Sequence, residues 1–456
     1  MTLNPDIFRE YSIRGVVPDE LNAPIAHRLG QALGTYLRGR EGRSAVVGHD
    51  VRLHSPELAD AFIVGLRGSG VDVIFLGLTP TPLINFATDL LGADAGVAVT
   101  ASHNPPGDNG LKIRTDHTLQ GAELRALREL AQQGRFAQGR GRLRGERVHE
   151  TYLGLVGARV PHSLGLRVVV DGGNGANGPL VATLLARLGC RVTLLHGEPD
   201  GRFPHRSPNP LAPGALEGLQ RAVRAEAADL GLAYDGDGDR LVVVDEAGQI
   251  AWGDRLLALL ARPLLATQPG ARVVYEVSCS QALVDDVLAH GGVPVASPVG
   301  YARVHERMRG EGAVLAGEMA GHFFFADPQF RFDDAILATA KVAELAAAAR
   351  RPFSALLAEL PTYHTSPERR VACPDERKEE VAAALARSYE GQRPLETLDG
   401  VRVQFPEGWG LVRASQTQPA LSMRFEGRSP EALAAIEAEL TGRLRGLLEG
   451  IGWREE

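Results

Sequence analysis

Cysteine is scarce in this chain of 456 residues, and its few positions follow no pattern. The three cysteines, Cys190, Cys279 and Cys373, are far apart and stand in no CxxC spacing. An odd, scattered set argues against a disulfide framework and a zinc site, and it fits a reducing compartment. The N-terminus also lacks the apolar core of a signal peptide, and no apolar run approaches the ~20 residues that span a bilayer. We therefore expect a cytoplasmic protein without a membrane partner.

An excess of positive charge is missing as well. The formal net charge is −7, and charged residues make up 23% of the chain. A nucleic-acid partner, which favours a basic face, is therefore not expected. A small anionic ligand stays compatible, because local positive groups can outweigh a weak overall charge. With 44% apolar residues, a chain of this length is expected to form roughly three domains, give or take one.

Lysine is rare too, because arginine supplies almost all of the basic side chains. The three lysines are Lys112, Lys341 and Lys378. Arginine cannot release its proton, whereas a partly desolvated lysine can act as an acid or a base. Lys112, in the segment Asn109-Gly110-Leu111-Lys112, is therefore a candidate catalytic residue, with a solvated surface lysine as the alternative.

Three stretches of the chain share one order of elements. Each has a β-branched strand that ends near an acid (Asp50, Asp171 or Glu276), a helical segment, a second strand opened by glycine, and a third apolar strand. The first strands are expected at residues 44–47, 166–170 and 271–275, the second at 70–76, 189–195 and 291–295, and the third at 96–100, 230–234 and 313–316. Strands that alternate with helical segments predict three similar α/β domains with mixed, largely parallel sheets.

The last part of the chain breaks this order. Strands are expected at 369–373, 401–405, 410–414 and 421–425, and helices at 376–389 and 430–448. This pattern is typical of a smaller α+β domain, which follows a hinge near residues 362–367. The predicted α/β domains are residues 1–149, 150–250 and 251–363, and the predicted α+β domain is residues 364–456.

Each third strand runs into a polar loop that contains glycine. In open α/β sheets the loops at the carboxyl ends of strands carry the chemistry. The loops that matter are therefore residues 101–112, 235–240 and 317–322.

The second loop, Asp235-Gly236-Asp237-Gly238-Asp239-Arg240, places three carboxylates on alternate residues. In an extended loop such residues point the same way, so their repulsion calls for a divalent cation between them. Carboxylate oxygens suit Mg²⁺, Mn²⁺ or Ca²⁺ rather than a soft metal. An EF-hand is one alternative, but its sixth position needs glycine and here is Arg240, and residues 241–244 are strand-like. A solvated acidic loop without metal is another.

The first loop opens with Thr100-Ala101-Ser102-His103-Asn104-Pro105. Serine needs activation to act as a nucleophile. A phosphoserine at Ser102 would add about two negative charges and three acceptor oxygens. The neighbouring Gly, Asn and Pro residues permit a tight turn whose backbone N–H groups face an anion. An ordinary surface turn with an Asn-Pro breaker remains the alternative.

Three further segments contain polar residues of interest. Gly317-Glu318-Met319-Ala320-Gly321-His322 offers a carboxylate for sugar hydroxyls and a histidine for proton transfer. Arg413-Ala414-Ser415-Gln416-Thr417-Gln418-Pro419 offers a guanidinium and hydroxyls that suit a phosphate. For both, a simple turn is the alternative. Gly173-Asn174-Gly175-Ala176-Asn177-Gly178 is a GxGxxG run, but a lone run of this kind is weak evidence for a dinucleotide site.

Together these motifs resemble the α-D-phosphohexomutase superfamily, and most closely its bacterial phosphomannomutase/phosphoglucomutase group. The motifs that carry the resemblance are FREYSIRG (8–15), TASHNPPGDNGLK (100–112), DGDGDR (235–240), GEMAGH (317–322) and RASQTQP (413–419), supported by VDGGNGANG (170–178) and GRFPHRSPNP (201–210). Five motifs in the family's order are far more specific than any one of them.

The resemblance implies four domains around one cleft and a role for each motif. Ser102 is expected to carry the phosphate, and Asp235, Asp237 and Asp239 are expected to hold Mg²⁺ together with one oxygen of phospho-Ser102. The expected catalytic residues are Ser102, Lys112, Arg240, His322, Arg14 and His103. The expected substrate-binding residues are Tyr11, Glu318, Met319, His322, Arg413, Ser415, Gln416 and Thr417.

The chain departs from the family pattern in places. Ser12 replaces an aspartate, which puts a supporting contact to Arg14 in doubt, and Ala320 replaces a serine of the sugar loop. Ser278 stands where the family commonly has lysine, so substrate phosphate is expected either to bind more weakly there or to be bound by Arg303 or His305 instead. In the last motif Gln416 replaces an asparagine, and Gln418 replaces an acid.

The implied activity is the interconversion of hexose 1-phosphate and hexose 6-phosphate, with mannose, glucose or both as the hexose. Glucose 1,6-bisphosphate or mannose 1,6-bisphosphate is expected as intermediate and activator, and small-molecule sugar phosphates are the expected partners of a monomer or dimer. Two alternatives stay open, namely a phosphoglucosamine mutase and a sugar-phosphate-binding homologue with weak turnover.

Overall fold

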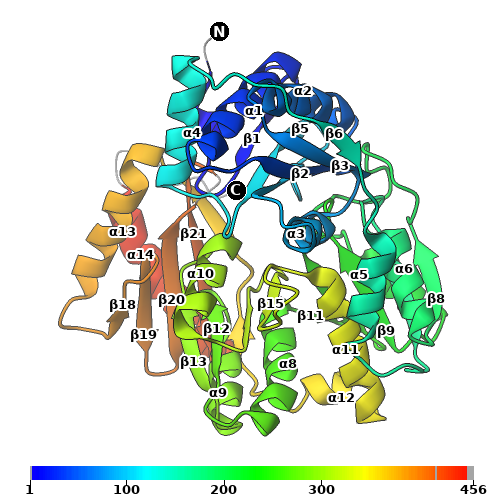
Figure 1. Cartoon of the computed structure of the whole chain (residues 1–456). Helices are drawn as coiled ribbons and strands as arrows, with labels where there is room; N and C mark the ends of the chain where they lie inside the picture. Colours follow the sequence, from blue (N-terminus) through cyan, green and yellow to red (C-terminus); the bar gives the residue numbers. More distant parts are fainter. Residues whose placement is uncertain (1–2, 416–417, 449–456) are drawn as a thin grey trace. The chain divides into compact units, whose positions relative to one another are not determined.

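The computed structural model describes residues 3–415 and 418–448 of the chain (Figure 1). The chain divides into two compact units. The first unit contains residues 1–253 and 320–356, and the second contains residues 254–319 and 357–456. The predicted domain at residues 251–363 is thus divided between the two units.

The first unit begins with a six-stranded sheet in the order β1-β5-β4-β2-β3-β6. Strands β2, β3, β4 and β6 are parallel, whereas β5 runs antiparallel to both β4 and β1. The strands are β1 (Ile13–Val16), β2 (Ser44–His49), β3 (Asp72–Leu78), β4 (Ala95–Val99), β5 (Asp108–Arg114) and β6 (Leu143–Gly145). The accompanying helices are η1 (Pro5–Ile7), α1 (Ala23–Arg38), α2 (Ser55–Gly68), α3 (Thr81–Leu90) and α4 (Ala122–Gln133).

Helices α1 and α2 pack unusually closely because glycines face each other across the contact. A Cβ atom on Gly30 would lie 2.2 Å from the carbonyl oxygen of Phe62, and one on Gly65 would lie 2.1 Å from that of His27. Any larger side chain at either position would therefore push the two helices apart. The apolar residues of α1 and α2 join those of β2 and β4 in one core.

The second sheet of the first unit has the order β11-β10-β9-β7-β8. Strands β7, β8 and β9 are parallel, and β10 turns back antiparallel to β9. The strands are β7 (Arg167–Asp171), β8 (Arg191–Leu195), β9 (Leu230–Tyr234), β10 (Leu241–Asp245) and β11 (Ile250–Ala251). The helices are α5 (His149–Gly157), α6 (Gly178–Arg187) and α7 (Glu217–Ala225).

Residues 320–356 add a strand, β15 (Phe323–Phe325), and a long helix, α11 (Ala335–Ala349), to the first unit. Helix α11 contacts α5, α6 and β10. Most of its alanine-rich surface is buried. This burial explains why the segment groups with the first unit rather than with the strands that precede it in the chain.

The second unit contains a parallel arrangement of β13, β12 and β14 followed by an antiparallel sheet. The first set comprises β12 (Arg272–Glu276), β13 (Val293–Ser297) and β14 (Leu315–Gly317), with helices α8 (Gly253–Thr267), α9 (Gln281–Ala289) and α10 (Tyr301–Glu311). The second comprises β16 (His364–Thr365), β17 (Arg369–Ala372), β18 (Leu395–Glu396), β19 (Val401–Phe405), β20 (Gly408–Ala414) and β21 (Ala420–Gly427), with helices α13 (Asp375–Tyr389) and α14 (Pro430–Leu447). Helix α12 (Phe353–Leu357) belongs to the first unit except for its last residue. Val277 packs with Trp409 and Leu411 and joins the two sets.

The predicted fold class is confirmed. Three sheets follow the repeated α/β order, with parallel strands at their centres, and the C-terminal sheet is antiparallel with two helices packed on it. The segment near residues 362–367, expected as a hinge, contains the short strand β16, which pairs with β21. Among residues 3–415 and 418–448, no helix is both long enough and apolar enough to cross a membrane.

Candidate active site

The loop after β4 holds Ser102 in an uncommon backbone conformation. Its φ angle is +52°, a region that non-glycine residues rarely adopt. The Ser102 backbone N–H donates to Thr100 Oγ1 at 2.8 Å, and Thr100 Oγ1 donates to Asp50 Oδ2 at 2.7 Å. Residues held this way persist only where their surroundings fix them, and they cluster at functional sites.

A buried arginine fixes the carbonyl groups of the same loop. Arg52, only 1% exposed, donates from Nη2 to the carbonyl oxygens of Ser102 and Asn104, at 2.8 and 2.6 Å. Its own charge is balanced by Asp50, with Nε to Oδ2 at 3.1 Å. Asp50 was expected as an acid near the end of a strand, whereas Arg52 was not predicted, because a single arginine in a loop carries no pattern.

The acidic loop lies directly beside Ser102. Ser102 Oγ donates to Asp235 Oδ2 at 2.6 Å. The nearest carboxylate oxygens of Asp235, Asp237 and Asp239 all lie within 4.8 Å of one another, and all three residues are buried. Residues more than 130 positions apart in the chain thus meet at one point, as the motifs predicted.

These three carboxylates fit a hard divalent cation. Burial, together with the charges of Asp237 and Asp239, raises the pKa of Asp235 to about 7. Asp237 Oδ1 is buried and has no hydrogen-bond donor among the described residues. A charged oxygen in such a place is costly unless a cation meets it. A Mg²⁺-type ion, which prefers oxygen ligands, satisfies both conditions.

Lys112 supplies positive charge to the same carboxylates. Its Nζ lies 2.7 Å from Asp237 Oδ2 and also contacts Asp239 Oδ2. Burial alone would disfavour a charged Asp239, but Lys112 and His322 hold the pKa of its carboxyl well below the usual range. The Thr81 hydroxyl adds a hydrogen bond to Asp237 Oδ2 at 2.7 Å from the N-terminus of α3. The rare lysine that the sequence singled out therefore belongs to the charge cluster.

The EF-hand alternative for the acidic loop is wrong, and the glycine-rich run has a structural role beside that loop. The residues after Arg240 form strand β10 rather than the second helix of an EF-hand. The glycine-rich run 173–178 closes on the acidic loop, because Ala176 N donates to Gly236 O at 3.1 Å and Asn177 Nδ2 to Gly238 O at 3.4 Å. The run therefore supports the acidic loop, and its glycines are explained without a dinucleotide.

Arg14 and His103 both adjoin the serine loop. Arg14 Nη1 donates to Ala101 O at 3.0 Å and to Asn104 Oδ1 at 2.7 Å, and its Nε donates to Ser12 Oγ at 3.2 Å. Ser12 therefore supplies a supporting contact despite replacing an aspartate. His103 Nδ1 lies 3.4 Å from Ser102 Oγ. Burial, together with the nearby charges of Arg240 and Arg14, keeps the pKa of His103 well below its usual value.

His322 lies within a buried acidic group that the sequence revealed only in part. Its Nε2 is 3.3 Å from Asp239 Oδ1, 3.4 Å from Arg240 Nε and 3.8 Å from Asp333 Oδ2. Burial and the charge of Asp239 raise the pKa of Asp333 to about 7. Asp333 was not predicted, because it follows the last motif residue by eleven positions in an unremarkable Asp-Asp pair before α11.

The remaining expected residue of the first unit is Tyr11, which is half-buried just before β1. The structure brings Ser102, Lys112, Arg240, His322, Arg14 and His103 together with the three aspartates in this unit.

In the second unit, Glu318 follows β14 and is buried. Its Oε1 accepts a hydrogen bond from the Gly300 backbone N–H at 2.8 Å, at the N-terminus of α10. The next backbone N–H, that of Met319, donates to Glu276 Oε1 at 3.3 Å. Residues 320–322 of the same motif group with the first unit.

The loop at residues 413–419, which is expected to bind phosphate, begins at the end of β20. Arg413 is buried there, with Nη2 3.7 Å from Glu368 Oε2. Although burial opposes the charge, Arg413 and Arg370 lower the pKa of Glu368. Ser415 N donates to Ala420 O at 2.9 Å, and Lys378 Nζ donates to Ser415 O at 2.7 Å. Lys378 was noted only as a rare lysine, and its place beside this loop was not foreseen.

Two expected residues of that loop, Gln416 and Thr417, lie outside the described residues. The next residue, Gln418, donates from its backbone N–H to Ser415 Oγ at 3.2 Å and accepts from Arg370 Nη1 at 2.6 Å. The amide at this position, where the family has an acid, thus keeps a contact to an arginine.

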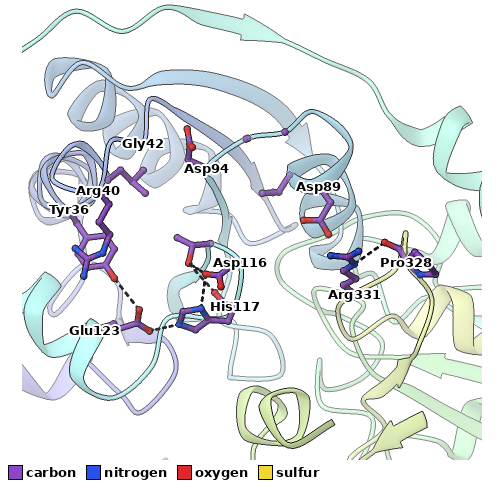
Figure 2. Close-up of a pocket in the computed structure, with 15 residues that line it drawn as sticks. Tyr36, Arg40, Gly42, Asp89, Asp94, Asp116, His117, Glu123, Pro328 and Arg331 are labelled. Carbon is purple, nitrogen blue, oxygen red and sulfur yellow. Dashed lines mark hydrogen bonds and ion pairs between the residues drawn. The ribbon is translucent and has the colours of Figure 1, made fainter. Parts of the chain in front are cut away.

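A pocket of about 740 Å³ in the first unit lies away from these residues (Figure 2). Asp94, directly before β4, and Thr115, directly after the antiparallel β5, are among its lining residues. The pocket therefore lies at the sheet edge opposite to Ser102, which follows the other end of β4. None of the described residues that we expected in the site lines it.

Comparisons with known proteins identify the family. Models of the four phosphoglucomutase/phosphomannomutase domains match the chain in order: alpha/beta/alpha domain I at residues 5–137, domain II at 151–248, domain III at 252–363, and the C-terminal domain at 368–443. The chain belongs to the phosphoglucomutase/phosphomannomutase family. The resemblance drawn from its motifs is therefore confirmed.

Individual relatives agree with this membership along nearly the whole chain. The phosphomannomutase/phosphoglucomutase of Pseudomonas aeruginosa is 39% identical over 98% of this chain and 97% of its own length. The phosphoglucomutase of Neisseria gonorrhoeae is 35% identical over 96% of each chain. The crystal structure of a phosphoglucomutase/phosphomannomutase family protein from Burkholderia thailandensis matches with a TM-score of 0.93 and 36% identity, covering 99% of this chain and 100% of that one.

Proposed function

We propose that this protein is a phosphohexomutase that interconverts the 1-phosphate and 6-phosphate of mannose, glucose or both. The observation that carries the proposal is the 2.6 Å hydrogen bond from Ser102 Oγ to Asp235, inside a buried cluster that also contains Lys112. A buried serine hydroxyl beside such a cluster of opposite charges suits phosphoryl transfer, which needs positioning and electrostatic stabilisation.

In the proposed cycle, the phosphoryl group moves from phospho-Ser102 to the free hydroxyl of a hexose phosphate. The hydroxyl oxygen forms a new bond to phosphorus while the bond from phosphorus to Ser102 Oγ breaks, and the hydroxyl proton passes to a nearby base. His322 is the proposed base, because its imidazole lies among Asp239, Asp333 and Arg240. The product is a 1,6-bisphosphate. Its other phosphoryl group then returns to Ser102 Oγ while the bond from phosphorus to the sugar oxygen breaks, and that oxygen takes up the proton that the base accepted.

The cations of the first unit stabilise the moving charge. Lys112, Arg14 and Arg240 would offer donors to the oxygens of the phosphoryl group, which become more negative as it transfers. Their positions are fixed by neighbouring carboxylates and carbonyls, so little reorganisation is needed. His103, held with a lowered pKa, would contribute a neutral hydrogen-bonding group next to Ser102 Oγ.

Asp235, Asp237 and Asp239, with one oxygen of phospho-Ser102, are the residues that would hold Mg²⁺. When bound, the ion supplies positive charge that offsets the carboxylates and the phosphoserine. Glucose 1,6-bisphosphate or mannose 1,6-bisphosphate would serve as activator, since either can charge Ser102 with phosphate.

The second unit would bind the parts of the substrate that do not react. Glu318 is proposed to accept hydrogen bonds from sugar hydroxyls, and the adjacent Met319 is proposed to contact the substrate as well. Arg413, Ser415, Gln416 and Thr417 are proposed to bind the distal phosphate, and Tyr11 of the first unit to contact the substrate. We also propose domain limits of 1–149, 150–250, 251–363 and 364–456, a cytoplasmic location, and a monomer or dimer that acts on free sugar phosphates.

Intact-mass measurement tests the central step. Protein treated with glucose 1,6-bisphosphate and Mg²⁺ should gain the mass of one phosphoryl group, and Ser102→Ala should gain none. Ser163→Ala is a matched control, because Ser163 also has a positive φ angle, +73°, but lies in an exposed turn. An adduct that persists in Ser102→Ala would sink the assignment of the phosphate carrier.

A coupled assay then tests turnover. Activity with the 1-phosphates of mannose, glucose and glucosamine should be highest for mannose, glucose or both. A strong preference for glucosamine 1-phosphate would transfer the proposal to the phosphoglucosamine mutases. Phosphorylation of Ser102 without turnover on any of the three would favour a sugar-phosphate-binding homologue.

A further inference from the structure

Two buried carboxylates anchor the start of the sugar loop. Glu276 ends β12 and is only 2% exposed. Its Oε1 accepts the backbone N–H of Met319 at 3.3 Å, while Glu318 Oε1 accepts the backbone N–H of Gly300 at 2.8 Å. The first contact fixes the peptide between Glu318 and Met319, and the second fixes the side chain of Glu318. Together they set the direction in which Glu318 presents its carboxylate.

Ser278 in turn holds Glu276 in place. Its backbone N–H donates to Glu276 Oε2 at 2.6 Å, and its hydroxyl lies 2.6 and 2.7 Å from the two carboxylate oxygens. The Glu276 side chain is thereby folded back on its own loop. A buried carboxylate needs several donors to offset its lost hydration, and Ser278 supplies two of them. The hydroxyl at this position, where the family pattern has lysine, therefore has a structural reason.

We propose that Glu276 and Ser278 form a positioning pair that orients Glu318 toward the sugar ring and so determines how tightly the hydroxyls of a hexose phosphate bind. The inference rests on the proposed role of Glu318 and goes beyond it, because it assigns the control of that role to two residues outside the motif. Neither residue touches the reacting groups, so both act through Glu318.

The physical reason is the geometry of charge-assisted hydrogen bonds. A carboxylate that accepts two hydroxyls binds strongly only when both oxygens are well placed, and a displacement of about 1 Å is enough to lose most of the advantage. The sugar loop has alanine and glycine after Met319, so its own side chains cannot fix Glu318. Support from outside the loop comes from Gly300, which binds the Glu318 side chain, and from Glu276 at the end of β12, the neighbour of β14 in the sheet.

Direct binding is the first readout. Calorimetric titration of the full-length protein with glucose 6-phosphate in the presence of Mg²⁺ should give a Kd about tenfold higher for Glu276→Gln than for the wild type. The substitution removes one hydrogen bond to a charged group and places the glutamine NH₂ against a backbone N–H. Ser278→Ala should show a smaller rise, and Ser278→Thr, which keeps the hydroxyl, should stay near the wild type. Ser297→Ala is the matched control, because Ser297 is an equally buried serine at the end of the adjacent β13 whose hydroxyl donates to Pro298 O.

Steady-state kinetics separate positioning from general damage. For Glu276→Gln and Ser278→Ala, KM should rise with kcat nearly unchanged, since the interaction is present in both the ground state and the transition state. Equal rises in KM for Ser278→Thr and Ser278→Ala would overturn the proposal, as would an unchanged Kd in folded Glu276→Gln. Should Glu276→Gln fail to fold by circular dichroism, the Ser278 variants decide.

A double-mutant cycle tests the route through Glu318. If Glu276 acts only by orienting Glu318, the double variant Glu276→Gln/Glu318→Gln should bind no more weakly than Glu318→Gln alone. Losses that multiply would overturn the proposed route. Wild-type binding without Ser102 phosphorylation would overturn the proposed activity alone, whereas wild-type protein that binds no hexose phosphate would overturn both proposals.

Discussion

The two units hold their buried charges in different ways. In the first unit, Asp235, Asp237 and Asp239 crowd together, and side-chain cations such as Lys112 offset them. In the second unit, Glu276 and Glu318 are fixed chiefly by backbone N–H groups and by one hydroxyl. The first unit thus offsets its carboxylates with full positive charges, whereas the second holds its carboxylates with neutral donors.

This difference matches the two tasks of the proposed reaction. Charge moves only where the phosphoryl group transfers, so the side-chain cations that can stabilise it belong to the first unit. Recognition of hydroxyls and of a distal phosphate requires fixed geometry, which belongs to the second unit. Variants of the two units should therefore affect different kinetic constants.

The largest effect is expected for Lys112 in the first unit. Lys112→Met should lower kcat by about 10²–10³, which is typical when one charged donor to a transition state is removed. KM for the sugar phosphate should change little, because Lys112 would contact the transferring group rather than the distal phosphate. Steady-state assays at saturating Mg²⁺ and activator measure both constants.

Lys112→Arg is the matched control for charge. It keeps the positive charge beside Asp237 and Asp239 but changes the shape of the donor and cannot release a proton. Activity between that of Lys112→Met and the wild type would agree with a mainly electrostatic role. A kcat for Lys112→Met close to the wild-type value would contradict the comparison at its strongest point.

A smaller effect with the opposite kinetic signature is expected for Arg413 in the second unit. Arg413→Ala should raise KM by about 10- to 100-fold, since charge-assisted hydrogen bonds contribute about 1.5–3 kcal/mol each and the site would bind ground state and transition state alike. Phosphorylation of Ser102 at high glucose 1,6-bisphosphate should still reach completion. Arg413→Lys keeps the charge but loses the planar guanidinium, so its KM should lie between those of Arg413→Ala and the wild type. A drop in kcat without a rise in KM would remove the distinction between the units.

The sequence was sufficient to locate the loops but not their supports. The acidic run and the Ser102 turn could be read because alternate aspartates and a strand followed by a polar turn have direct chemical consequences. The predicted strands lie within about two residues of the observed ones, and they differ at glycine turns. Residues 70–76, for example, were expected as a strand, but Gly70 has a φ of +83° and β3 begins at Asp72.

The supporting residues could not be read in this way. Arg52, Asp333 and Glu276 act through contacts to residues 50, 11 and 43 positions away, and each is a common residue type in an ordinary context. Only the tertiary fold shows that Arg52 gathers the carbonyls of the serine loop. A resemblance to a family finds the motifs that the family shares, whereas Ser278 shows that a departure from the pattern can be explained only by its contacts.

The smallest effect, on stability, is expected for a cluster of charged residues that is partly exposed to solvent. At the pocket of Figure 2, His117 lies 2.8 Å from Asp116 Oδ1 and 2.9 Å from Glu123 Oε2. Partial burial lowers the pKa of His117, but the two carboxylates outweigh it and the net shift is upward. A histidine whose pKa is raised on folding stabilises the native state below its unfolded pKa, near 6.5, and loses that contribution as pH rises through the folded value.

His117→Gln should therefore reduce the fall in thermal unfolding midpoint between pH 5.5 and pH 8. The side chain is 38% exposed, so solvent screening limits the contribution to a few tenths of a kcal/mol, up to about 1. His162→Gln, at an exposed position of the same unit, is the control for replacing a histidine that is not in this cluster. A change in the thermal unfolding midpoint as large as that expected for a buried ion pair would contradict this prediction. Exposure to solvent would then not explain the difference between the His117 cluster and the cluster around Ser102. Comparing the Lys112 and His117 variants thus tests whether the burial of charged groups, rather than their number, determines how strongly they contribute in the first unit.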